Sequence, residues 1–368
     1  MKNTFGTAVS LTLFGESHGP AVGAVLDGLA PGLDVDEDYI AHKMDLRRAA
    51  GAISTGRREP DEVEILSGVF NGKTTGTPLC LAIRNRAQNS GDYADNYGLA
   101  RPGHADYTGF VKYHGFEDHR GGGHFSGRLT APVVAAGAIL TAALEKRGVA
   151  IGSHILRCGG VSDRPFSAAG TELTNDLRRL NAMDFAVLDP DAGAAMKAAI
   201  LKAAEEKDSV GGVMETAVTG LPAGLGEPWF DSVESLLSHL LFSVPAVKGV
   251  EFGDGFGFAD LKGSKANDPF VTENGTIRTK TNRNGGVNGG ITNGMPLLFR
   301  TAVKPTPSIF RKQETVDFLK NENAEIEMKG RHDPAVIHRA RVVVDSLTAL
   351  ALADLLTVRY GTDALRGD

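Results

Sequence analysis

Hydrophobic and polar positions alternate in short stretches of this chain, which is the pattern of strands that bury one face of a sheet. β-Branched residues within the stretches, and glycines or prolines beside them, support the strand interpretation. Three stretches fall in the first quarter of the chain and three fall later. The predicted strands cover residues 10–13, 63–69, 78–84, 149–157, 211–220 and 296–302.

Two longer segments, residues 131–147 and 334–358, are apolar on nearly every helical face. A helix of this kind is buried on all sides, so we expect both to lie inside the protein. Thr130 is the predicted N-cap of the first helix. Asp333 is the predicted N-cap of the second, with Pro334 in its first turn. Buried helices need a layer on either side, and sheets are the layers that the strand pattern provides.

Shorter helices are also predicted. Asp36 begins one of them, and the helical spacing that follows places Arg47 and Arg48 at its end. Two more amphipathic helices are predicted over residues 190–207 and 231–241, with Glu234 placed to complete a capping box in the second.

Residues 253–293 are rich in glycine and asparagine, and they contain Asp-Gly and Asn-Gly turns. This composition predicts a long functional loop region. We find no internal repeat and no change of composition that marks a linker, so residues 1–368 are predicted to form a single domain.

Composition narrows the possible functions. The chain has 368 residues, 42% of them hydrophobic and 23% charged, and a formal net charge of −6. Aromatic residues make up only 7%, and no basic run has the length of a nucleic-acid-binding arm. The 46 glycines show no collagen-like period. We therefore expect a globular protein that does not bind nucleic acid.

Cysteine usage and the N-terminus bear on location. Cys80 and Cys158 form no disulfide framework, and the first residues do not resemble a signal peptide. The longest apolar stretch, residues 131–144, is too short to span a bilayer. We expect a cytoplasmic protein with no membrane partner.

Arginines gather in pairs in this acidic chain, which favours a site for small anions. Solvated helix faces are the alternative for any single pair. The pairs are Arg47 with Arg48, Arg57 with Arg58, Arg120 with Arg128, and Arg331 with Arg339.

Four segments place a histidine or an acid among glycines: residues 14–19, 101–106, 121–128 and 330–334. His18 could act as a general acid, or it could be hydrogen-bonded within its own turn. His104 precedes Asp106 by two positions, a spacing found in metal half-sites and in imidazoles oriented by a carboxylate.

Gly121–Arg128 runs directly into the helix at residue 131. Its glycines could form an anion cradle or a tight packing corner. Lys304 and Ser308 lie on a proline-stiffened loop that suits a phosphate, and residues 288–294 could accommodate a flat ring. Several histidines lie between His104 and His124, but none shows the spacing of a metal site, so we predict no metal.

Together these segments resemble chorismate synthase. The resemblance rests on residues 15–19, 101–107, 121–123, 247–256, 289–292, 304–306 and 331–334, and it extends from Gly15 to about Arg339. It implies an α+β fold in which a helical layer lies between two antiparallel sheets, a β-α-β sandwich, and a homotetramer. It also implies a lyase that converts 5-enolpyruvylshikimate 3-phosphate to chorismate and phosphate with reduced FMN. NADPH would be an indirect reductant acting through an external flavin reductase.

The resemblance also assigns roles to residues. His18 and His104 would be acids, and Asp333 would relay the ring proton, unless it serves only as a helix cap. Arg47 matches a position associated with NADPH or with the anion site. Contacts to FMN are implied for His124, Phe125, Ser126, Ala246, Gly289, Lys304, Pro305, Thr306, Pro307, Ser308, Arg331 and Arg47, and contacts to the substrate for Arg47, Arg48, Arg128 and Arg339.

The chain departs from the family pattern at three places. Many members have arginine and serine where this chain has His124 and Phe125. Many also have Arg-Pro-Gly and a further arginine after the arginine pair, where this chain has Ala49, Ala50 and Gly51. Many have serine where it has Pro307. Two other functions remain as alternatives: a metal-dependent phosphohydrolase that uses the His104–His124 cluster, and a flavin- or anion-binding protein without catalysis.

Overall fold

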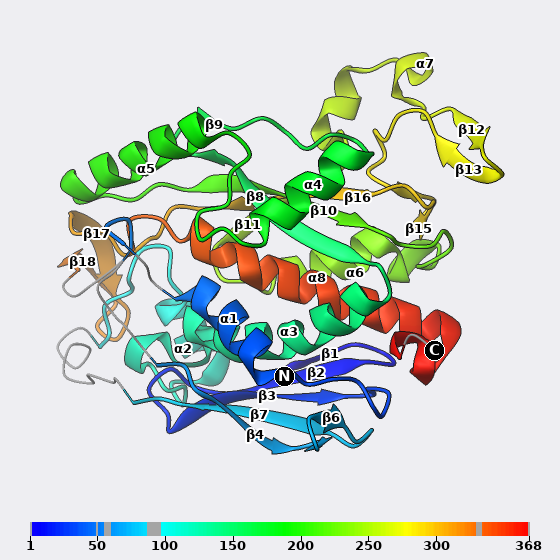
Figure 1. Cartoon of the computed structure of the whole chain (residues 1–368). Helices are drawn as coiled ribbons and strands as arrows, with labels where there is room; N and C mark the ends of the chain where they lie inside the picture. The colour runs from blue at the N-terminus through cyan, green and yellow to red at the C-terminus, as the bar shows by residue number, and fades with distance from the viewer. Residues whose placement is uncertain (1, 49–50, 55–59, 87–96, 329–332, 367–368) are drawn as a thin grey trace.

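Two five-stranded antiparallel sheets enclose a layer of helices (Figure 1). The computed structural model describes residues 2–48, 51–54, 60–86, 97–328 and 333–366. The first sheet has the strand order β1-β2-β3-β7-β4, formed by Thr4–Phe5, Ser10–Gly15, Ala21–Asp27, Leu79–Arg84 and Val63–Ser67. The second has the order β11-β16-β10-β8-β9, formed by Val247–Phe252, Leu297–Val303, Gly212–Thr219, Ala150–Cys158 and Val161–Ser162.

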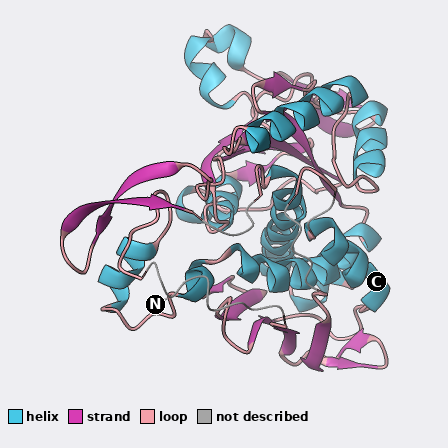
Figure 2. Cartoon of the chain, turned by 90° about the vertical axis from the view of Figure 1, so that its left-hand side faces the viewer, coloured by secondary structure: helices cyan, strands magenta, loops and turns pink. Residues whose placement is uncertain are grey.

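The two apolar helices form the centre of the protein, as their pattern predicted. They are α3 (Thr130–Lys146) and α8 (Ile337–Tyr360), and α1 (Glu37–Arg47) and α6 (Val233–Leu241) lie beside them. Figure 2 shows helices between the strands at the top and bottom of the molecule. α4 (Thr171–Leu180) and α5 (Pro190–Glu205) cover the outer face of the second sheet. The β-α-β sandwich is therefore confirmed.

Smaller elements surround these layers. α2 (Asp106–Tyr113) and two 3₁₀ turns, Arg120–Phe125 and Gly127–Leu129, precede α3. A hairpin of β17 (Lys312–Asp317) and β18 (Glu322–Glu327) projects at the left of Figure 1. The remaining short pieces are β5 (Val69–Phe70), β6 (Lys73–Thr74), η4 (Trp229–Asp231) and η6 (Thr362–Leu365).

The predicted strands all appear, with bounds shifted by a few residues, whereas three predicted helix starts are wrong. Thr130 is the first residue of α3 rather than its N-cap, which is Leu129. α8 begins at Ile337, and Val336 is its N-cap without a side-chain hydrogen bond, so Asp333 does not cap it. α6 is capped by Ser232, which accepts from the Ser235 backbone, rather than by a capping box ending at Glu234. Asp36 caps α1 as predicted, accepting from the backbone of Tyr39.

The glycine-rich segment 253–293 is not one long functional loop. It contains a 3₁₀ turn, a short helix and two small hairpins at the upper right of Figure 1. None of its residues lines the main cavity described below. Its elements are η5 (Gly255–Asp260), α7 (Gly263–Ala266), β12 (Phe270–Glu273), β13 (Thr276–Thr279), β14 (Val287–Asn288) and β15 (Ile291–Thr292).

One stretch, Gly127–Lys146, is long and apolar enough to cross a membrane. Residues 131–144 alone predicted a segment too short to span a bilayer, so that prediction is wrong. In the structure, 83% of its apolar window is buried inside the protein. Such burial is expected of a helix in the middle layer of a β-α-β sandwich.

The segment between β1 and β2 is tied to α8. The carboxylate of Asp354 on α8 accepts hydrogen bonds from the backbone N–H groups of Thr7, Ala8 and Val9, at 2.7–3.1 Å. These three groups lie just before β2 and would otherwise have no sheet partner at the start of the strand.

α3 and α8 cross in close contact at a glycine. A Cβ atom placed on Gly137 would lie 2.2 Å from the Cβ of Ser346 on α8. No side chain larger than hydrogen fits at this point, so Gly137 sets how closely the two central helices approach each other.

Gly137→Ala should destabilise the protein although alanine is the better helix former. Overpacking costs about 1–3 kcal/mol, against a gain of roughly 1 kcal/mol in helix propensity. We expect a net decrease in the free energy of unfolding, measured with urea. Gly263→Ala, where a new Cβ meets nothing within 4 Å, is the control. A Gly137→Ala protein as stable as the wild type would contradict the close crossing.

A row of charged side chains crosses the second sheet. Arg300 on β16 binds Glu251 at 3.2 Å and Glu215 at 3.0 Å. His154, on β8, then contacts Glu215 through Nε2 and Asp163 through Nδ1, both at 3.2 Å. Ionised carboxylates only accept hydrogen bonds, so both ring nitrogens donate and the imidazole is protonated. Burial alone would lower the pKa of His154, but its hydrogen bonds to Asp163 and Glu215 outweigh this and raise it.

This raised pKa predicts a loss of stability at alkaline pH. The contribution of His154 is fully present below its unfolded pKa of about 6.5 and is lost as pH rises through the folded pKa. We expect the free energy of unfolding, measured with urea between about pH 6 and pH 9, to fall by a component that His154→Gln lacks. His42→Gln, at an exposed histidine, is the matched control for the substitution itself. Parallel curves for wild type and His154→Gln would refute the protonated imidazole.

Candidate active site

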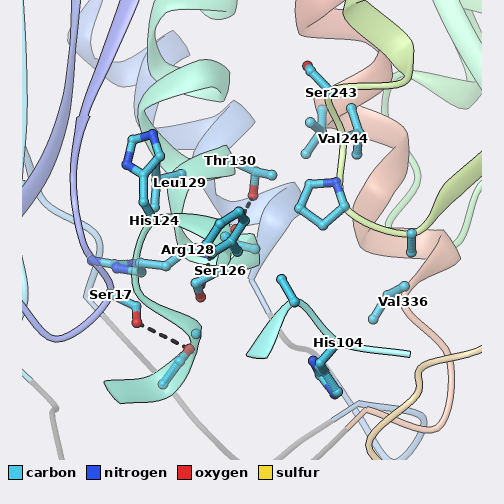
Figure 3. A pocket seen from close by; sticks show the side chains of 18 of the residues that line it. Ser17, His104, His124, Ser126, Arg128, Leu129, Thr130, Ser243, Val244 and Val336 are labelled. Carbon is cyan, nitrogen blue, oxygen red and sulfur yellow. Dashed lines mark hydrogen bonds between the residues drawn. The ribbon is translucent and has the colours of Figure 1, made fainter. Parts of the chain in front are cut away.

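A cavity of about 1810 Å³ opens between the first sheet, the N-terminal ends of α3 and α8, and the loop that follows β16. In Figure 3, the labelled residues lie on opposite walls: Ser17, His124 and Arg128 on one, and Ser243, Val244 and Val336 on the other. Most of the predicted site residues line this cavity: His18, Arg47, Arg48, His104, His124, Phe125, Ser126, Arg128, Ala246, Lys304, Thr306, Pro307, Asp333 and Arg339.

Three predicted contacts lie outside the cavity lining, and a fourth is not among the described residues. Gly289 lies in the turn between β14 and β15, outside the residues that line the cavity. Pro305 and Ser308 do not line it either, although Ser308 bonds a lining residue. Arg331 lies outside the described residues, as do Arg57 and Arg58 and the departure at Ala49 and Ala50.

His18 lies in a turn directly after β2 and is only 5% exposed. The hydroxyl of Ser17 is 3.1 Å from His18 Nδ1, so part of the predicted bonding within the turn is present. A Cβ on Gly121 would lie 2.1 Å from His18 Cε1, and Gly121 has φ +60°. The glycine-rich loop therefore acts here as a packing corner that brings its backbone against the imidazole.

His124 and Ser126 belong to the same corner. His124 Nδ1 lies 2.8 Å from the carbonyl oxygen of Gly15, which can only accept, so Nδ1 carries a hydrogen. Ser126 accepts from the backbone N–H of Arg128 and caps the short turn before α3. Phe125 is 42% exposed and packs edge-on against Tyr113.

His104 faces the opposite side of the cavity, on the loop before α2. Its Nε2 lies 2.7 Å from the hydroxyl of Ser308. The carboxylate of Asp106 forms a two-point ion pair with Arg101 at 2.6 and 2.8 Å. Lys304 donates to the carbonyl of Gly103 at 2.8 Å, so residues 103–104 and the loop after β16 hold each other in place.

Two predicted anion-binding arginines come together in the cavity wall. Arg47, at the end of α1, and Arg128, just before α3, are 7% and 8% exposed. Both bind the carboxylate of Asp61, Arg47 through Nη2 at 2.8 Å and Arg128 through Nη1. Burial lowers the pKa of Arg47 to about 10 although Asp61 opposes it, so the guanidinium is charged at neutral pH. Burial would raise the pKa of Asp61, but the two arginines lower it.

The comparisons with known proteins agree on one family. A family model described as chorismate synthase matches residues 9–357. The chorismate synthase of Dehalococcoides mccartyi is 47% identical over 357 residues, covering 96% of this chain and 96% of the relative. That of Thermococcus gammatolerans is 46% identical over 354 residues, covering 96% of this chain and 97% of the relative. The chain belongs to the chorismate synthase family.

A solved structure supports the same assignment. A crystal structure of chorismate synthase superimposes on this chain with a TM-score of 0.77 at 29% identity, covering 98% of this chain and 96% of that chain. The family makes the chain a lyase of the shikimate pathway, as the sequence predicted. The metal-dependent phosphohydrolase finds no support in these comparisons, and the described residues contain no group of three or more His, Cys, Asp or Glu side chains that could hold a metal.

Asp333 lies just before α8, but it does not bind the backbone N–H groups of the helix as predicted. Instead of capping the helix, its carboxylate binds Nη1 of Arg339 at 2.5 Å. Arg339 also donates through Nε to the backbone carbonyl of Arg47 at 2.8 Å. Arg48 is more exposed and binds Asp45 and the carbonyl of Pro60. The ends of α1 and α8 are thereby joined at the cavity.

The cavity has polar atoms that fit a bound cofactor and substrate. Thr306 Oγ1 and Arg47 Nε are buried and have no hydrogen-bond partner among the described residues. Thr306 lies in the segment that the resemblance assigns to FMN, beside Lys304. A phosphate or a flavin ring edge would satisfy such atoms, whose burial without a partner is otherwise unfavourable.

Two residues of this wall were not predicted from the sequence. Asp61 joins the arginines, and Asn85 accepts from Arg128 Nε at 2.9 Å. The amide group of Asn85 also donates to the carbonyls of Glu16 and Gly19, at 2.9 and 2.8 Å, and so fixes the turn that carries His18. Neither residue lies in a glycine-rich motif or beside a histidine, so the sequence pattern carried no signal for them.

Proposed function

We propose that this chain converts 5-enolpyruvylshikimate 3-phosphate to chorismate and phosphate by a 1,4-elimination that requires reduced FMN bound in the cavity. The observation that carries the proposal is the convergence of two buried arginines, two histidines and a carboxylate on one cavity in a chain of this family. These groups come from five separate parts of the sequence, as expected of an assembled active site.

FMN fits the wall formed by the 3₁₀ turn before α3 and the loop after β16. When bound there, reduced flavin would supply electron density to the substrate as phosphate leaves and recover it as the ring proton departs. Lys304 and Thr306 would hold its polar groups, and Ser308 would orient His104. We propose as cofactor contacts His124, Phe125, Ser126, Ala246, Lys304, Thr306 and Pro307, which line the cavity, with Pro305 and Ser308 beside them.

The arginines provide for a substrate with two carboxylates and one phosphate. Arg47 and Arg128 are buried and charged, and guanidinium groups bind such anions with two parallel hydrogen bonds. Arg48 and Arg339 lie at the edge of the same wall. We propose all four as substrate-binding residues. Arg47 and Arg128 share the Asp61 carboxylate, whereas Arg48 pairs with Asp45 and Arg339 pairs with Asp333.

Three groups are proposed to move protons. His104, on the side of the cavity opposite Arg128, protonates the departing phosphate. His18, buried beside Ser17, donates a hydrogen bond or proton that maintains the reduced cofactor. Asp333 accepts the ring proton, and its ion pair with Arg339 holds the carboxylate at the cavity. General acids and bases of this kind contribute about 10²–10⁴-fold to the rate.

Anaerobic turnover with reduced FMN tests the reaction. We expect chorismate, detected by its absorbance, only when substrate and reduced FMN are both present, and no change on adding a chelator. Oxidised FMN is the matched control. Phosphate release that persists without flavin and stops with chelator would instead establish a metal-dependent phosphohydrolase.

Asp333→Asn tests the proposed base. The amide keeps the shape and a hydrogen-bond acceptor for Arg339 but cannot take up a proton, so turnover should fall by about 10²–10⁴-fold. Reduced FMN should still bind. Asp208→Asn is the control, because Asp208 pairs with Arg311 at 3.0 Å outside the cavity. Normal turnover by Asp333→Asn would mean that another group accepts the proton.

We further propose that the chain works in the cytoplasm as a homotetramer. A separate flavin reductase would supply reduced FMN, with NADPH as the indirect reductant. Unpaired Cys80 and Cys158 fit a reducing compartment, and exposed aromatics such as Trp229 and Phe230 fit burial between subunits. Light scattering on the purified chain tests the assembly.

A further inference from the structure

Asp61 stands between two arginines in a wall of the cavity, with only 4% of the residue exposed. Its Oδ2 accepts from Arg47 Nη2 at 2.8 Å, and its Oδ1 accepts from Arg128 Nη1. Each carboxylate oxygen thus binds a different guanidinium. The backbone of Asp61 has φ +47°, an uncommon conformation for a residue other than glycine, asparagine or aspartate.

This arrangement fixes both guanidiniums. Arg128 is held from a second side by Asn85, whose Oδ1 accepts from its Nε at 2.9 Å. Arg47 is anchored by Asp61 and by Thr130 Oγ1 at 3.4 Å, whereas its own Nε is buried without a partner among the described residues. Two like charges this close would repel each other in a buried wall, and one shared carboxylate offsets that repulsion.

The charges add to one net positive charge. With two arginines and one aspartate, the wall attracts an anion. It attracts the anion less strongly than two arginines without the aspartate would. Asp61 therefore sits where it sets both the direction and the net charge of the arginine pair.

We propose that Asp61 is a positioning residue for the reaction: it orients Arg47 and Arg128 toward the anionic groups of the substrate and limits their net charge. The inference rests on the proposed function of the cavity. Asp61 acts through the two arginines and needs no contact with the substrate or the cofactor.

The proposal predicts that loss of the Asp61 charge has opposite effects on two quantities: phosphate affinity rises and turnover falls. In Asp61→Asn the wall gains one positive charge, so a small symmetrical anion, which needs little orientation, should bind more tightly. The elimination needs the substrate in one orientation, and misplacement by about 1 Å costs on the order of 100-fold in rate. Asparagine is a mild substitution here because it tolerates positive φ.

The experiment compares inorganic phosphate binding, by calorimetry, with the steady-state kinetics of the holoenzyme under reduced FMN. For Asp61→Asn we expect phosphate to bind about three- to tenfold more tightly. We expect kcat to fall by about tenfold to 100-fold while KM stays equal or decreases. Asp61→Glu, which restores the charge but displaces the carboxylate, should bind phosphate like the wild type and still lose turnover, and it decides the matter if Asp61→Asn does not fold.

Asp34→Asn is the matched control, because Asp34 also bridges two cations, Lys73 and Lys146, but does so on the surface and outside the main cavity. It should change neither phosphate binding nor kcat. A lower melting temperature of Asp61→Asn with unchanged phosphate affinity and kcat would assign it a merely structural role and overturn the proposal, as would weaker phosphate binding. An inactive wild type would refute the proposed function, whereas the phosphate measurements would still decide the role of Asp61.

Discussion

The close crossing of α3 and α8 is the contact on which the rest of the structure depends. Because Gly137 lets the backbone of Ser346 approach, the two apolar helices pack as one layer that is thin enough for a sheet on each side. The same crossing places the N-terminal ends of both helices beside one cavity. Arg128 and Thr130 come from the start of α3, and Asp333 and Arg339 come from the start of α8. The packing of the core and the position of the site residues therefore both depend on the lack of a side chain at Gly137.

In the arginine pair at the cavity and in the row across the second sheet, every charged member has a partner of the other sign. Removing cations from water is costly unless a carboxylate lies within hydrogen-bond distance, so Asp61 serves two arginines and Glu215 serves both His154 and Arg300. The two systems differ in net charge. The row across the second sheet contains three carboxylates and two cations, whereas the pair at the cavity keeps an excess positive charge. Only the arginine pair at the cavity therefore attracts an anion.

The sequence predicted the layers well because period-2 and all-apolar helical patterns depend on local residues and on burial. It missed β3, whose segment Ala21–Asp27 contains small residues and a glycine that give little strand signal. It also misplaced the start of α8, since Arg339, one turn into the helix, competes for the Asp333 carboxylate. His18 and His104 were found through their glycine neighbours. Asp61 and Asn85 were not, because their partners are 14 to 69 residues away in the sequence.

The anchoring of the segment before β2 by Asp354 has a consequence for how the chain folds. The backbone groups of residues 7–9 meet their acceptor across 345 to 347 positions, so this connection waits until nearly the whole chain has left the ribosome. Contacts of such long range form slowly, and partly made sandwiches expose apolar faces meanwhile. A nascent chain lacking α8 keeps an unfinished first sheet, and its vulnerability to aggregation and proteolysis ends when the last helix is inserted between the sheets.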